Sequence, residues 1–205
     1  MKKEITDILK AHREYVQQAR SMYEGVEKAL WAEYQNRNAP GYTSRNKEAM
    51  RVRDEAIQGS RQQTLKACRD TLDDVRGKIR AFAATPVDPT FPAAMAALQA
   101  MKNPTKAELD MIAGQYSNNY LCYRAICDTL GGSAAGFRSI TLDDMLAECD
   151  KVQKAVEKAM NGDVEAYGFR VLEAGHIIGQ LEENCTYFLG GHFDNLATNK
   201  QDTQE

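Results

Sequence analysis

Long apolar runs are missing from this sequence of 205 residues. The longest lies around Pro92 to Leu98, far short of the roughly 20 residues that a membrane-spanning helix needs. The first ten residues also include Lys, Glu and Asp, where a secretory signal peptide would have an apolar core. We therefore expect no membrane partner and a cytoplasmic location.

Paired cysteines and histidine clusters are missing as well. The five cysteines form no Cys-x-x-Cys pair, and there are three histidines. Each cysteine lies where a helix would place a small apolar residue, so we predict free, buried thiols in a reducing compartment. No cysteine has a nearby histidine or basic cluster that would favour a reactive thiolate.

No catalytic motif is present either. The sequence has no His-Glu-x-x-His zinc motif, no glycine-rich phosphate loop after a strand and no pattern typical of a Ser-His-Asp triad. Glu173 and His176 form a single Glu-x-x-His pair, whereas a di-iron helical bundle needs two such pairs and two further glutamates. We predict no catalytic residue, no metal site, no cofactor and no enzymatic activity.

Proline is scarce, and four of the five prolines fall between Pro86 and Pro104. Ala, Gln, Glu, Lys, Arg, Met and Leu dominate elsewhere, and these residues favour helix. The predicted fold class is all-α: a long N-terminal antiparallel helical hairpin, similar to a coiled-coil arm, followed by a small helical bundle.

Residues 1–84 are predicted to form the hairpin arm. Apolar residues between positions 5 and 30 recur at alternating steps of three and four, which is the heptad spacing of a coiled coil. Turn-forming residues from Asn38 to Gly41 mark the bend, and a second helix runs from about Arg45 to Ala83. The predicted packing and self-association seam comprises Ile5, Ile8, Leu9, Val16, Leu65, Leu72, Val75, Ile79 and Phe82.

The second helix of the hairpin has a polar middle. Residues 58–63 include no apolar side chain, so this stretch is either solvated or a polar layer of a coiled coil. We expect the tip, Glu33 to Arg53, to be the mobile part that contacts a partner. A two-helix hairpin buries only one seam, and association with another copy would add the missing burial.

A proline-rich segment, residues 85–92, is the predicted linker, because proline breaks helices and biases its predecessor away from helix. Residues 93–191 are predicted to form a four-helix body, and residues 192–205 a disordered tail. Within the body, Thr105 and Glu108 form a capping box. The helix that begins there is predicted to reach about Leu130.

Charge is unevenly spread along the chain. Residues 1–82 contain 17 Lys and Arg against 12 Asp and Glu, a balance of +5, which leaves −8 for residues 83–205. The contrast indicates either a basic arm with an anionic partner or attraction between arm and body. Interleaved acidic residues, and the lack of aromatics placed for base stacking, weigh against nucleic-acid binding. The candidate anion contacts are Arg51, Arg53, Arg61 and Arg69, and the alternative function that they suggest is a nucleic-acid-associated helical regulator.

Two segments, Asn103 to Asp110 and Gln115 to Tyr120, together with the hairpin and linker, carry a family resemblance. The chain resembles small uncharacterised helical proteins encoded in phage or prophage structural and head-morphogenesis regions of Gram-positive bacteria. The resemblance implies a virion assembly or minor structural role, with other phage structural proteins or further copies as partners. It brings no catalytic residues. We therefore predict a non-enzymatic assembly protein that self-associates through its arm and is made in the cytoplasm, where it either remains or becomes incorporated in the virion.

Overall fold

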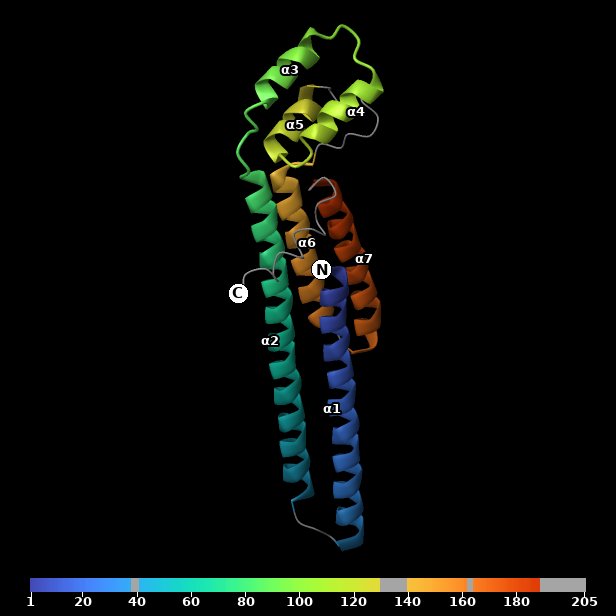
Figure 1. Cartoon of the computed structure of the whole chain (residues 1–205). Helices are drawn as coiled ribbons and strands as arrows, with labels where there is room; N and C mark the ends of the chain where they lie inside the picture. Colours follow the sequence, from blue (N-terminus) through green and yellow to red (C-terminus); the bar gives the residue numbers. More distant parts are fainter. Residues whose placement is uncertain (38–40, 130–139, 162–163, 189–205) are drawn as a thin grey trace, which may run out of the picture. The chain divides into compact units, whose positions relative to one another are not determined.

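The computed structural model describes residues 1–37, 41–129, 140–161 and 164–188, which form seven α-helices and no strand (Figure 1). The all-α fold predicted from the sequence is confirmed. The predicted tail, residues 192–205, lies outside the described residues, as do residues 38–40 of the predicted bend. Gly41 has a φ of 86°, a left-handed conformation that glycine adopts without strain.

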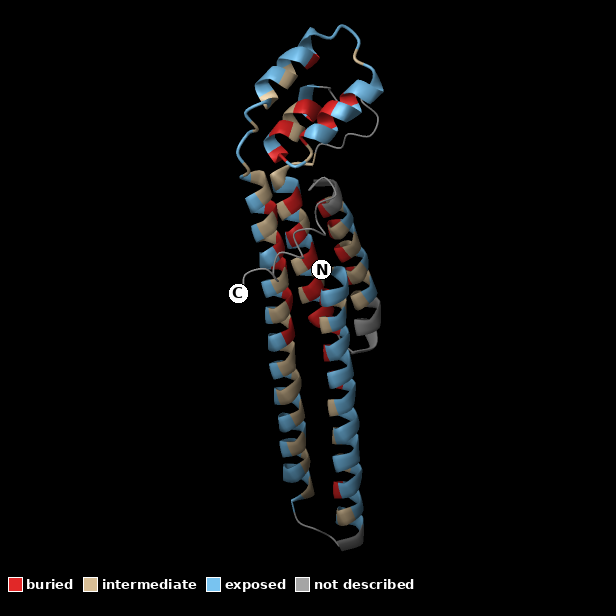
Figure 2. Ribbon diagram, in the orientation of Figure 1, coloured by how far each residue is buried: buried red, intermediate tan, exposed pale blue. Residues whose placement is uncertain are grey.

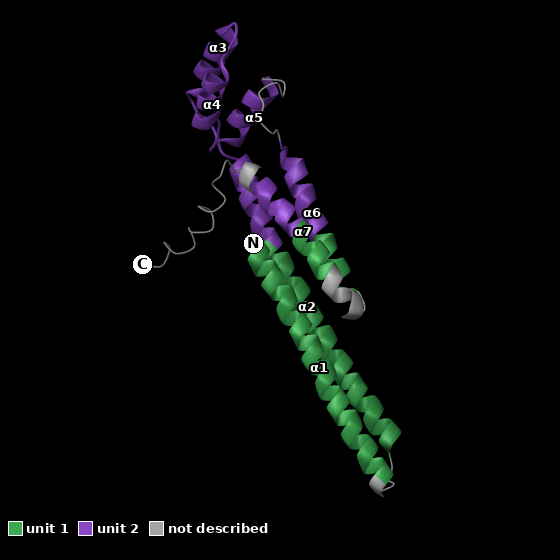
Figure 3. Cartoon of the chain, turned by 90° about the vertical axis from the view of Figure 1, so that its right-hand side faces the viewer, with its two compact units in different colours: residues 1–71, 153–176 green, residues 72–152, 177–205 purple. Residues whose placement is uncertain are grey.

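The chain divides into two compact units (Figure 3). Unit 1 contains residues 1–71 and 153–176, and unit 2 contains residues 72–152 and 177–205. This division differs from the predicted domains, because residues 85–92 fall within unit 2. The Asn119 side-chain amide donates a hydrogen bond to the Pro86 carbonyl, which fastens this segment to the rest of unit 2.

Unit 1 contains an antiparallel helical hairpin made of α1 (Lys2–Arg37) and the first part of α2 (Tyr42–Ala83) (Figures 1 and 3). Residue numbers rise along α1 while those of the facing residues fall along α2, as the sequence predicted. Three hydrogen-bonded side-chain pairs show this antiparallel direction: His12 with Ser60, Tyr23 with Asn46, and Glu33 with Arg45.

Parts of α6 (Leu142–Met160) and α7 (Val164–Phe188) also belong to unit 1. Arg69 of α2 donates to Glu157 of α6 at 2.9 Å. Such exposed ion pairs contribute little, so the buried apolar residues hold these helices in place. In this part of unit 1 they are Val156, Ala159, Met160 and Ala174.

Three short helices in unit 2 share a hydrophobic cluster: α3 (Phe91–Ala100), α4 (Lys106–Gln115) and α5 (Tyr120–Thr129). The predicted capping box is confirmed, because Glu108 N–H donates to the Thr105 hydroxyl and Thr105 N–H donates to the Glu108 carboxylate. The buried members of the cluster are Leu98, Leu109, Ile112, Ala113, Tyr116, Cys122 and Ile126.

The prediction of one helix from Lys106 to about Leu130 is wrong. The structure divides this segment into α4 and α5, and Asn119 supplies the physical reason. Its buried side chain accepts a hydrogen bond from the Cys122 N–H at 3.1 Å, as the cap at the start of a new helix does. The described residues between 91 and 188 therefore form five helices, where four were predicted for residues 93–191.

The rest of unit 2 contains residues 72–83 of α2, residues 142–152 of α6 and residues 177–188 of α7. Arg76 donates to Asp73 and to Asp150, each at 2.7 Å, and so links α2 to α6. The buried apolar residues here are Leu72, Val75, Ile79, Met145, Cys149, Val152, Ile178, Leu181 and Cys185.

Gly77 offers a test of the part of α2 that belongs to unit 2. It is exposed within α2, and a Cβ atom added there would have no heavy atom within 4 Å. Glycine costs about 0.8–1 kcal/mol relative to alanine inside a helix. We expect Gly77→Ala to raise the free energy of unfolding by about 0.5–1 kcal/mol in urea titrations. A loss of stability would contradict the assignment of a continuous, exposed α2 at this position.

Candidate functional site

An apolar groove runs between α1 and α2 on one side of the hairpin in unit 1. Two hollows, with volumes of about 740 and 530 Å³, share Tyr15 and Ala56 and so form one continuous groove. We call it the hairpin groove. Its apolar lining comprises Ile8, Ala11, Tyr15, Ala19, Met22, Val26 and Leu30 of α1 and Ala49, Val52, Ala56 and Ala67 of α2.

Large apolar side chains in the hairpin groove are open to solvent. Met22 is 73% exposed and Val52 is 53% exposed, and Tyr15 and Val26 are exposed too. Figure 2 shows that exposed and intermediate residues predominate along the half of the hairpin nearest its bend. Moving a Val or Met side chain from full exposure to full burial contributes about 1.5–3 kcal/mol, and covering these partly exposed side chains would contribute a part of that. The groove is therefore a surface that another molecule could stabilise by covering it.

The broad apolar stripe of α1 explains how the groove arises. One flank of the stripe is buried, and Leu9 and Val16 belong to it. The other flank lies one position away in each heptad and contains Ile8, Tyr15 and Met22, which line the groove. Since one facing helix covers only part of a wide stripe, the second flank stays open.

His12 forms a polar layer inside the hairpin. Its ring Nδ1 lies 2.8 Å from the Ser60 hydroxyl, and the side chain is buried. Burial lowers the pKa of His12 below its ordinary value, and the neighbouring Arg61 guanidinium lowers it further. His12 therefore stays neutral at pH 7. Ser60 belongs to the polar stretch 58–63, and its hydrogen bond shows that part of this stretch forms a polar layer.

The lowered pKa of His12 predicts a pH dependence of stability. Protonation of His12 favours the unfolded chain, where its pKa is about 6.5. The contribution of neutral His12 to stability is therefore fully present above pH 6.5 and is lost as the pH falls from there through the lower pKa of the folded chain. We expect urea unfolding to show a steeper loss of stability from pH 7 to pH 5 for the native chain than for His12→Gln. Identical slopes would contradict this role of His12.

Polar contacts border the hairpin groove. The Tyr23 hydroxyl donates to Asn46 at 3.2 Å, and the Arg53 guanidinium lies 4.5 Å from the centre of the Tyr23 ring. Arg45 donates to Glu33 at 3.0 Å. A polar rim around an apolar centre is the usual anatomy of a protein interface.

Aromatic rings gather where α1 ends and α2 begins. Trp31 lies 5.7 Å from Tyr34 and 5.4 Å from Tyr42, measured between ring centroids. Trp31 and Met22 are nine residues apart, about two and a half helical turns, so they lie on opposite sides of α1. These rings hold the two helices together at the predicted tip and stand apart from the hairpin groove.

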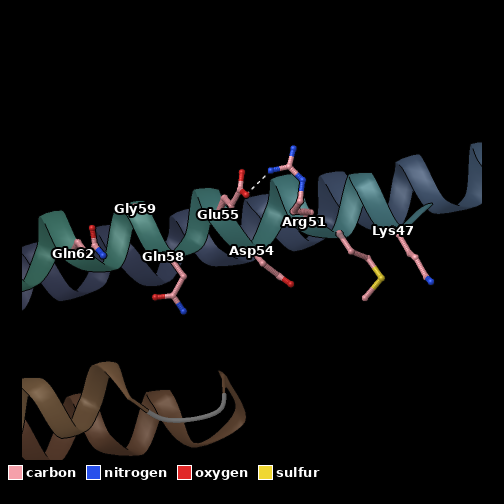
Figure 4. A pocket seen from close by; sticks show the side chains of 8 residues that line it. Lys47, Arg51, Asp54, Glu55, Gln58, Gly59 and Gln62 are labelled. Atoms are coloured by element: carbon pink, nitrogen blue, oxygen red, sulfur yellow. Dashed lines mark hydrogen bonds and ion pairs between the residues drawn. The ribbon is translucent and has the colours of Figure 1, made fainter. Parts of the chain in front are cut away.

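The arginines predicted as anion contacts have other partners. Arg51 binds both Glu48 and Glu55, and Figure 4 shows Arg51 paired with Glu55 on a mixed polar face of α2. Arg53 pairs with Asp54 and Arg69 with Glu157. The fourth, Arg61, lies close enough to His12 to lower its pKa. Carboxylates thus pair with three of the four candidate arginines. Because nucleic-acid binding needs positive charge that is available to phosphates, these ion pairs weigh against the alternative function.

The predicted seam is only partly buried. Ile5, Leu9, Val16, Leu72, Val75 and Ile79 are buried, whereas Ile8, Leu65 and Phe82 are half-buried. In unit 2 the Phe82 ring packs against Tyr120, with 6.4 Å between centroids. The sequence also predicts that the α2 members of the seam pack against its α1 members. This pairing stays a prediction, and it would place Leu65, Leu72, Val75, Ile79 and Phe82 against Ile5, Ile8, Leu9 and Val16. Met22, Val26 and Val52 were not predicted to form an open groove.

Among the described residues, the side chains that could bind a metal and the cysteine thiols have ordinary structural contacts. No group of three His, Cys, Asp or Glu side chains in these ranges is placed to hold a metal ion. Glu173 forms an ion pair with Lys158, with 3.1 Å between the carboxylate oxygen and Nζ. Burial raises the pKa of Cys68 and of Cys149 to about 11, so these thiols stay protonated. All five cysteines are free and buried, as predicted.

No protein-family model, curated protein or solved structure matches the chain. Its function is therefore argued from the hairpin groove. Among the described helices, none has the length and hydropathy needed to span a membrane.

Proposed function

We propose that this protein is a non-enzymatic interaction and assembly protein that self-associates through the hairpin groove. The observation that carries the proposal is the exposure of Tyr15, Met22, Val26 and Val52 along one groove. Single exposed apolar residues are ordinary, but a contiguous apolar patch with a polar rim marks an interaction site.

The shape of the groove favours a helical partner. From Ile8 to Leu30 it follows 23 residues of α1, and the 22 steps between them, at 1.5 Å each, span about 33 Å. A helix of similar length would lie between α1 and α2 and bury its own apolar face there. If this helix belongs to a second hairpin, that hairpin adds its other helix too, which gives the four helices of a stable bundle.

A role in phage-type virion assembly, or as a minor structural protein, extends this proposal. It rests on the resemblance of Asn103 to Asp110 and Gln115 to Tyr120 to proteins of phage structural regions. Self-association fits such a role, because assembly proteins act through contacts between many copies. The expected partners are further copies or other structural proteins of the particle.

Light scattering of the full chain tests self-association. We expect a molar mass of at least twice 22.9 kDa at tens of micromolar, falling towards the monomer value on dilution. A strict monomer at tens of micromolar would contradict the proposed function.

A further inference from the structure

We propose that the occupant of the hairpin groove is α1 of a second copy, which runs antiparallel to the first about a two-fold axis beside Gln18 and Ala19. This inference rests on the proposed function and adds the partner, its orientation and its register. It concerns unit 1 alone, since α1 and both walls of the groove belong to that unit.

One side of α1 carries no charged residue over 22 positions, and it includes the groove-lining residues Ile8, Ala11, Tyr15, Gln18 and Met22. Steps of three and four from Ile8 reach positions 11, 15, 18, 22, 25 and 29, and each of these residues is uncharged. All except Ile8 are exposed, and Ile8 is half-buried. A solvated helix face normally carries charges, and the charged residues of α1 between positions 8 and 29 lie on its other sides. This strip is long enough for a helix-to-helix contact of about 32 Å.

The strip is complementary to itself when read in the opposite direction. In a two-fold interface, residue i faces residue j and residue j faces residue i. When the numbers of facing residues add up to about 37, Ile8 faces Ala29 and Tyr15 faces Met22. A large side chain thus meets a small one, and a methionine sulfur meets an aromatic ring, which is a favourable contact. Each pair forms twice.

Small residues allow the two helices to approach closely near the axis. In the same register Ala11 faces Gly25, and Ala19 faces its own copy. A Cβ atom added to Gly25 would have no heavy atom within 4 Å in the single chain, so nothing obstructs a second helix there. Gln18 also faces its own copy, and two facing amides can donate and accept hydrogen bonds in turn.

Charges at the edge of the strip also favour the antiparallel orientation. Asp7 and Lys28 are exposed, and this register brings each beside the other on the second copy. Glu4 and Glu33 continue the strip at its two ends and face each other in this register, and Arg45 lies 3.0 Å from the Glu33 carboxylate, which offsets their repulsion.

A parallel two-fold arrangement would instead place Tyr15 against Tyr15 and Met22 against Met22. It would also leave Asp7 and Lys28 about 32 Å apart along the helices. The facing of large side chains and the loss of the pairing between Asp7 and Lys28 weigh against it.

Single cysteine substitutions in the full chain distinguish these arrangements. Position 18 lies at the axis, where the Cα atoms of the two copies come within about 7 Å of each other. Mild oxidation of Gln18→Cys, without any second variant, should therefore give a disulfide-linked dimer. Ala29→Cys should give no such dimer, because its copy is about 32 Å away. A mixture of Ile8→Cys and Ala29→Cys should give the mixed dimer. The native chain is the background control, since all five of its cysteines are buried.

The outcomes separate this inference from the proposed function. An Ala29→Cys dimer that forms as readily as the Gln18→Cys dimer would show a parallel arrangement and overturn the inference. An associated chain in which none of these cysteines cross-link would overturn the register while self-association stands. A chain that light scattering shows to be monomeric would remove both.

Discussion

Replacing Met22 by glutamate is expected to convert the associated protein to monomers. Met22 is 73% exposed, so the new carboxylate is solvated in the single chain and the fold is retained. In the associated state it would be desolvated against apolar side chains, twice in each dimer. We expect the dissociation constant to rise at least ~100-fold, which corresponds to about 2.7 kcal/mol. Sedimentation equilibrium of the variant and the native chain measures the change.

Met111→Glu is the matched control for this substitution. Met111 is 68% exposed and belongs to α4 in unit 2, so the residue type and exposure match while the groove is untouched. Its dissociation constant should equal that of the native chain. If both variants weaken association equally, added negative charge and not the groove is responsible.

Leu9→Ala is expected to have the largest effect on folding. Leu9 is 1% exposed on the buried flank of α1 and does not line the hairpin groove. Removing a buried leucine side chain to Cβ leaves a cavity and typically costs about 2–5 kcal/mol. Urea unfolding at a fixed low protein concentration should show this loss, since association would otherwise add to the measured stability.

Leu172→Ala controls for the loss of leucine itself. Leu172 is 75% exposed on α7, so its truncation should change the free energy of unfolding by no more than about 0.5 kcal/mol. Equal losses at Leu9 and Leu172 would contradict the assignment of the buried flank of α1.

The helices and the direction of the hairpin were predictable because local rules agree with the fold. Proline is scarce outside residues 86–104, and the capping box at Thr105 acts within one turn. The break at Asn119 was missed because apolar residues at 116, 120 and 123 continue the helical spacing across it. A side chain that caps the next helix competes with that pattern and overrides it.

The hairpin groove could be predicted only in part. The sequence shows that the apolar stripe of α1 is wide, and Met22 and Val26 lie within it. Which flank is buried depends on how α2 is rotated against α1, and no local pattern sets that rotation. The contact between Arg69 and Glu157 joins residues 88 positions apart. By contrast, Arg51 pairs with Glu48 and Glu55 at helical spacing, which the sequence alone can suggest.

Thiol labelling at the hairpin groove tests the central claim most directly. In Met22→Cys the thiol lies on the exposed flank of α1, so a maleimide should react with it rapidly at nanomolar protein. If a second copy covers the groove, labelling should slow at least ~10-fold at tens of micromolar, with the reagent in excess throughout. Met111→Cys should react at the same rate at both concentrations. Equal rates for Met22→Cys across this range would contradict the claim that the groove is the surface of self-association.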